Sequence, residues 1–136
     1  IKFLEDSKLS ELKKIERISD YINERKSEIE EENKTRNINK TLLLNGRNIT
    51  NIGLFRRYAL AYLNSHPEVN KDLTLMVRQL APTAQGVPIE IYAFAADKKW
   101  VNYEQIMSDI FDHLLASIPY FDLECFEYSY SSNTSK

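Results

Sequence analysis

The chain has 136 residues, enough for one modest hydrophobic core but not for two independent ones. Apolar residues make up 43% and charged residues 28%, as in ordinary globular chains, and a formal net charge of -2 gives no overall basic field for nucleic acid or anionic lipid. The single cysteine, Cys125, excludes an internal disulfide framework and the common multi-cysteine zinc sites.

Residues 7–33 contain neither Gly nor Pro and are rich in Glu, Lys, Leu and Ile, which predicts one long helix. At about 100° per residue, its apolar side chains form a narrow stripe with charge elsewhere. The stripe comprises Leu4, Ile15, Ile18, Ile22 and Ile29, flanked by Leu12. Because this spacing is not an a/d heptad, we expect Ile15, Ile18, Ile22 and Ile29 to dock the helix onto a globular partner.

The next stretch predicts a strand followed by a helix. Either the apolar run at residues 41–44 or the extended piece at residues 47–52 supplies the strand, on one side or the other of a turn at Asn45-Gly46. Apolar residues then repeat at helical spacing over residues 54–63, with Thr50 or Asn51 as the candidate N-cap.

The remainder predicts a hairpin, a second helix and a last strand. Residues 72–97 read as two extended segments joined by a loop that holds Pro82 and Gly86. A helix capped by Asn102 covers residues 103–118, and residues 120–131 close as a strand. The expected fold class is α+β, a ferredoxin-like βαββαβ domain preceded by a long amphipathic helical segment. The expected boundaries are 1–37 for the helical segment, 38–130 for the α/β domain and 131–136 for a polar tail.

The predicted sheet has one face suited to packing on helices and a second face that is less polar than a face exposed only to water would be. One face alternates apolar residues that two helices can cover. The other carries the residues that we expect to form a subunit or domain interface: Met76, Tyr92, Phe94, Phe126 and Tyr128. We call these five residues the aromatic set. Because a face that met only water would be mostly polar, they predict a partner, be it the first helix, another subunit or a ligand.

RNA-recognition domains also place aromatics on the open face of a βαββαβ sheet. The third strand of this sheet has no basic residue and exposes Glu90, so we expect no nucleic-acid binding.

The helical stretch "SDIFDHLL" places Asp109, Asp112 and His113 within a turn and a half. An acid-base or metal site needs enclosure and a third partner, and His66 is the only other histidine. We therefore interpret these residues as a solvated face, with Asp109 and His113 as an ordinary i, i+4 pair. No catalytic residue, cofactor site or metal site is predicted.

The segments "TLMVRQL", "VNYEQI" and "SDIFDHLL", within a longer run from residue 50 to 121, resemble the cytosolic C-terminal part of the miniconductance branch of MscS-like mechanosensitive channels. The beginning of the chain is similar to the helical insertion that this branch carries. The resemblance implies the cytosolic portion of a tension-gated ion channel that protects bacteria against hypo-osmotic shock. It acts in subunit assembly and formation of a cytosolic cage, on the cytoplasmic side of the inner membrane.

The partners that the resemblance implies are copies of the chain itself, as a heptamer, and the upstream membrane and β domains of the same protein. The chain has no run of the ~18 apolar residues that a bilayer span needs, so we expect no direct membrane contact by this fragment. Two alternatives stay open. One is a free-standing ferredoxin-like ligand-binding or regulatory module, and the other is a small hydrolase, for which Arg78 and Asn102 are the candidate anion cradle.

Overall fold

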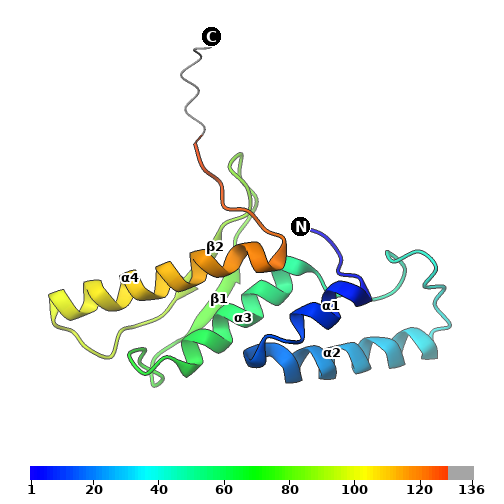
Figure 1. The fold of residues 1–136 in the computed structure, drawn as a ribbon, viewed down its shortest axis with the longest axis horizontal. Coiled ribbons are helices and arrows are strands. Elements are labelled where there is room, and N and C mark those ends of the chain that lie inside the picture. Colours follow the sequence, from blue (N-terminus) through cyan, green and yellow to red (C-terminus); the bar gives the residue numbers. More distant parts are fainter. Residues whose placement is uncertain (129–136) are drawn as a thin grey trace, which may run out of the picture.

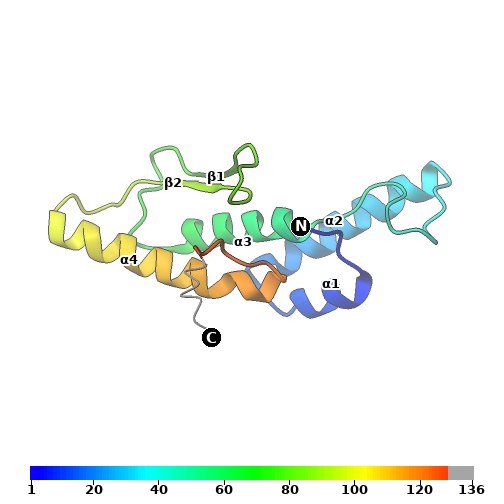
Figure 2. The ribbon, with the colours of Figure 1, turned by 90° about the horizontal axis from the view of Figure 1, so that it is seen from above.

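The computed structural model describes residues 1–128 and has an α+β fold, as the sequence predicts. Its helices and strands, in chain order, are α1 (Asp6–Leu12), α2 (Glu16–Thr35), α3 (Asn51–Ser65), β1 (Met76–Gln79), β2 (Ile89–Tyr92), α4 (Trp100–Ser117) and the 3₁₀ helix η1 (Ile118–Phe121). The hairpin β1–β2 lies on one side of α3 and α4, while the first turns of α2 lie alongside α3, with α1 next to α2 (Figures 1 and 2). None of the described helices is long and apolar enough to cross a bilayer.

The predicted single N-terminal helix is wrong, because the chain turns between α1 and α2. The amide of Ile15 donates to the carbonyl of Leu12 at 3.0 Å, and Ile15 itself is extended with ψ of 109°. Because of this break, α2 folds back on α1, and buried apolar residues of both helices reach the core around α3. Neither Gly nor Pro marks the break, so the sequence carries no local signal for it.

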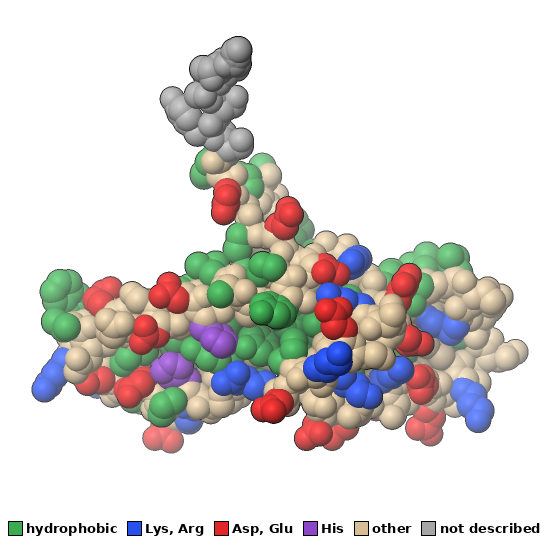
Figure 3. Space-filling model, viewed as in Figure 1, with side chains coloured by type: hydrophobic (Ala, Val, Ile, Leu, Met, Phe, Trp, Pro, Cys, Tyr) green, Lys and Arg blue, Asp and Glu red, His purple; other side chains and the backbone are tan. Residues whose placement is uncertain are grey.

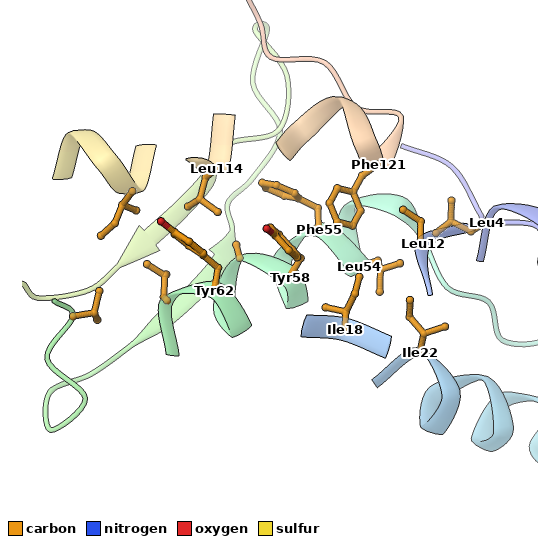
Figure 4. Packing of buried hydrophobic residues seen from close by; sticks show 14 of the residues in the cluster. Leu4, Leu12, Ile18, Ile22, Leu54, Phe55, Tyr58, Tyr62, Leu114 and Phe121 are labelled. Atoms are coloured by element: carbon orange, nitrogen blue, oxygen red, sulfur yellow. The ribbon is translucent and has the colours of Figure 1, made fainter. Parts of the chain in front are cut away.

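Helix α3 is the centre of the core. Thr50 caps it, with its Oγ1 accepting the amide of Gly53 at 3.1 Å. One large cluster of buried residues surrounds it, and Figure 4 shows Ile18 and Ile22 of α2 pointing toward Leu54. The helix thus joins the N-terminal helical pair to the rest of the fold, which argues against treating residues 1–37 as a separate folding unit.

The first predicted strand is absent from the described residues. Residues 40–46 form turns, and residues 47–49 belong to no strand. Phe3 instead forms an isolated antiparallel bridge with Thr50, and the amide of Leu4 donates to the carbonyl of Ile49 at 2.8 Å. Residues 2–4 therefore form backbone hydrogen bonds with the segment that was predicted to be the first strand, and that segment does not join the sheet. The expected turn at Gly46 is present, with φ of +72°.

The sheet consists of β1 and β2 alone, paired antiparallel with Met76 opposite Tyr92 and Gln79 opposite Ile89. The last predicted strand is not formed in the described residues: residues 120 and 121 belong to η1, and residues 123–128 belong to no helix or strand. We call residues 123–128 the C-terminal segment. The rest of that predicted strand, at residues 129–131, and the predicted polar tail at residues 131–136 lie outside the described residues. The described chain is thus α+β with two strands, fewer than a complete ferredoxin-like sheet needs.

The N-terminal residues are fastened to the end of η1 by one buried side chain. Asn51 is fully buried, and its Oδ1 accepts the amide of Lys2 at 2.9 Å. Its Nδ2 donates to the carbonyl of Phe121 at 3.0 Å. Nearby, the carboxylate of Asp122 pairs with Lys2 at 2.9 Å and with Lys8 at 3.3 Å, and these hydrogen bonds lower its pKa. We call Asn51 and Asp122, with Lys2, the terminal clamp.

Candidate functional site

The predicted helix-docking residues lie where α2 faces α3, although they are not equally covered. Ile18 and Ile22 are fully buried in the core cluster around α3. Ile15 is half-buried at the turn before α2 and packs against the same cluster. Ile29 is buried but lies outside that cluster, toward the loop that follows α2. Docking therefore depends mainly on the first two turns of α2.

Three residues of the aromatic set share the outer face of the hairpin. Met76 and Tyr92 are opposite each other in the register, and Phe94 follows with its ring edge-on to Tyr92 at 5.4 Å between centroids. Arg78 and Glu90 stand beside them as an ion pair of 2.7 Å. On the inner face, Leu75, Val77, Ile89, Ile91 and Ala93 pack against the core. Along the hairpin, exposed residues therefore alternate with residues packed on the core, as predicted.

The other two residues of the aromatic set do not belong to that sheet face. Phe126 and Tyr128 lie on the C-terminal segment, with ring centroids 4.9 Å apart. The amide of Gln85, in the hairpin loop, donates to Tyr128 Oη at 3.5 Å. All five residues are exposed, from 37% for Met76 to 82% for Tyr128. The structure therefore presents two aromatic pairs on separate elements rather than one continuous sheet face.

A groove runs between the hairpin and the C-terminal segment. It has a volume of about 440 Å³, with Ile89 and Ile91 of β2 on one side and Leu123 and Phe126 on the other. Phe111 and Leu115 of α4 lie along its floor. We call this space, defined by these six residues, the edge groove. A shallower continuation extends along the C-terminal segment to Ile1.

Asp109 and Asp112 of α4 are exposed, as the sequence predicts, but His113 does not belong to that solvated face. The ring of His113 is half-buried and stacks on Tyr62, with centroids 4.0 Å apart and planes 3° from parallel. Its Nε2 lies 2.6 Å from Tyr58 Oη, a hydrogen bond between α4 and α3. Asp109 forms no pair with His113 and accepts from Gln105 at 3.0 Å. The predicted i, i+4 pair is therefore wrong, and His113 joins two helices.

Basic groups surround His113 on the face where both histidines lie side by side (Figure 3). Arg17 of α2 sits over the Tyr62 ring at 5.2 Å, and the His66 ring meets that ring edge-on at 5.7 Å. Burial, with the positive charge of Arg17 and the neighbouring His66, lowers the pKa of His113. The neutral imidazole is thus the form that this cluster favours.

Stability should fall as the pH is lowered from about 7, where an unperturbed histidine is neutral. The folded protein takes up the His113 proton at a lower pH than the unfolded chain does, because the pKa is lowered in the folded state. Between those two pKa values the unfolded chain binds more protons, so acid favours unfolding there, and below both values no further loss arises from this group. Urea unfolding at several pH values measures this slope. His113→Gln should remove most of it, whereas His66→Gln should keep most of it; equal slopes in both variants would contradict the assignment.

The remaining polar candidates do not form a reactive site. Arg78 is bound to Glu90, and Asn102 donates to Asp97 at 2.7 Å, so each side chain of the proposed anion cradle is engaged elsewhere. Among residues 1–128 no group of three or more His, Cys, Asp or Glu side chains is arranged to hold a metal ion. A hollow of about 700 Å³ between α2 and the loop at residues 37–48 is lined by mixed charged and apolar residues.

A comparison with protein-family models found no match to this chain. A comparison with solved structures found no matching fold. The function is therefore inferred from the residues and from their arrangement.

Proposed function

We propose that this chain is an assembly module in the cytosolic part of a tension-gated, MscS-like mechanosensitive channel. The observation that carries the proposal is the exposed aromatic set: five large side chains on the outer face of the hairpin and on the C-terminal segment, uncovered by any element of residues 1–128. Large exposed aromatics on a soluble fold are typical of interfaces. The segments "TLMVRQL" and "SDIFDHLL" support the family.

In this proposal the module lies on the cytoplasmic side of a bacterial inner membrane and assembles with copies of itself, as a heptamer, and with upstream domains of the same protein. It contributes to a cage below a pore that opens after hypo-osmotic shock and carries out no chemistry itself. The finer fold would be ferredoxin-like, because α3, the hairpin and α4 follow one another in the αββα order found inside a βαββαβ fold.

The test replaces Tyr92 and Phe94 by Ser in the full-length channel. We expect the oligomer to be lost or weakened at least ~10-fold in detergent extracts, because exposed aromatics at interface centres account for about 2 kcal/mol or more each. The free energy of unfolding of the isolated chain should change by less than about 1 kcal/mol, since both rings are already over a third exposed. The matched control is Trp100→Ser with Tyr120→Ser, two exposed aromatics on α4 and η1. Equal losses of assembly and of fragment stability would contradict the proposal.

A ligand-binding or regulatory module is the second candidate, and the edge groove favours it. Its volume of about 440 Å³ lies within the range of small-molecule sites, and its walls are mostly apolar. The groove is open, however, and the only charged residue along it is Glu124, so few polar groups would orient a small ligand.

A further inference from the structure

Within residues 1–128, the outer edge of β2 pairs with no other strand. The amide of Leu80 donates to the carbonyl of Pro88 at 3.0 Å, so residues 80 and 88 form a hydrogen-bonded pair of the antiparallel ladder. Hydrogen-bonded pairs alternate along such a ladder, which makes Arg78–Glu90 and Met76–Tyr92 the next ones. The amide and carbonyl groups of Ile89 and Ile91 therefore point away from β1. Because the sheet has two strands in the described part of the chain, these groups meet no neighbouring strand there.

The edge groove lies along this free edge, and its opposite wall is also unpaired. Within residues 1–128, the backbone of the C-terminal segment makes no hydrogen bond to another backbone group. The segment belongs to no helix or strand and contributes Leu123 and Phe126 to the groove. The free edge of β2 and a segment without backbone hydrogen bonds in the described residues thus border one apolar groove, and the side chains of Phe111 and Leu115 on α4 remain half-exposed beside it. Unpaired edges of this kind are templates for another strand.

We propose that the edge groove binds a single extended peptide strand, which hydrogen-bonds to β2 and packs against the C-terminal segment. The strand would place apolar side chains at alternate positions onto α4, as in β-strand addition to other domains. Glu124 and Glu127, which are exposed and form no ion pair within the described part of the chain, favour a strand flanked by Lys or Arg. This inference is independent of the proposed channel function.

The strand is expected to come from polypeptide other than a second copy of residues 1–128. The extended stretches described here are already engaged: residues 2–4 pair near Thr50, and β1 pairs with β2. The C-terminal segment forms one wall of its own groove, so donating it to a second copy would dismantle that groove. The β2 strand of a second copy is already paired with its own β1 and packed on its own core, so it cannot enter the groove as a single strand.

The test uses the full chain and a capped peptide in which valine alternates with threonine between terminal lysines. At millimolar peptide, we expect the amides of Ile89 and Ile91 to exchange with deuterium at least ~10-fold more slowly, because pairing protects them. The amides of Val77 and Gln79 point from the far edge of β1 and serve as the internal control, with no change. A peptide methylated on alternate backbone nitrogens should give no protection.

Two variants that each introduce a glutamate test whether the peptide binds in the edge groove. Leu115→Glu places charge on the groove floor at a side chain that is already 53% exposed, and it should abolish the protection. Tyr120→Glu, at a 69% exposed residue that does not line the groove, should leave it unchanged. The proposal is overturned if neither amide is protected, or if the methylated peptide protects equally. Protection that appears without peptide and follows dimer formation in ultracentrifugation would overturn it too, because a second copy would then be the occupant.

Discussion

Replacing Asn51 by Ala should lower the free energy of unfolding by about 2–4 kcal/mol, because it leaves buried backbone groups without partners. Asn51 is 0% exposed, and its amide joins the amide of Lys2 to the carbonyl of Phe121. Alanine is the better helix former, so propensity alone would predict a gain at this position of α3. Urea unfolding followed by circular dichroism gives the free energy.

Asn39→Ala is the matched control for that substitution. Asn39 is exposed, and its Oδ1 accepts only from Thr41 within its own loop, so its loss should cost less than about 0.5 kcal/mol. Asn51→Asp separates the two halves of the terminal clamp, because a carboxylate still accepts from Lys2 but cannot donate to Phe121. If Asn51→Ala cost no more than Asn39→Ala, the clamp would carry no stability.

The second large effect is expected in α2, where Ile22→Ala should lower the free energy of unfolding by about 2–5 kcal/mol. Ile22 is 0% exposed and packs in the cluster that includes Leu54 and Leu12, so truncation leaves a cavity between α1, α2 and α3. Near-UV circular dichroism should change in the same transition, since Tyr58 and Phe55 belong to that cluster.

Ile29→Ala changes the same side chain on the same helix outside the core cluster. It should cost less than half as much, because the neighbouring hollow between α2 and the following loop already leaves it loosely packed. Equal costs at the two positions would mean that α2 is docked along its whole length rather than by its first two turns.

The elements that the sequence predicted well are those stabilised locally. Helices α3 and α4 and the hairpin have apolar periodicity and turn residues that agree with one another, and Thr50 caps α3 as predicted. The predicted cap of α4 is wrong, because that helix begins at Trp100 and Asn102 lies within it, donating to Asp97. The prediction of a first strand was wrong because the run after Asn45-Gly46 pairs with residues 2–4, which are distant in sequence, rather than with the sheet. The break between α1 and α2 likewise follows from packing against α3, which no local pattern encodes.

The site was misread for a related reason. Helix α4 carries an apolar arc wide enough to face two environments: Ile106, Ile110 and Leu114 enter the core, while Phe111 and Leu115 turn toward the edge groove. The prediction treated Asp109, Asp112 and His113 as one solvated face and so placed His113 on the outside of the helix. The signal that could have corrected it is the spacing of His113 three residues after Ile110 and seven after Ile106, which places it beside the core.

The terminal clamp also fixes where the amino end of the chain emerges. Because Lys2 is tied to Asn51 and Asp122, Ile1 is held beside the continuation of the edge groove. A strand fused ahead of Ile1 through a short flexible linker would meet β2 as an intramolecular ligand, at an effective concentration of about millimolar. A strand with an intrinsic dissociation constant well below about 1 mM would then occupy the groove most of the time. Loosening the clamp by Asn51→Ala would lower that local concentration, and it would also release the carbonyls of Phe121 and Asp122 just before the C-terminal segment.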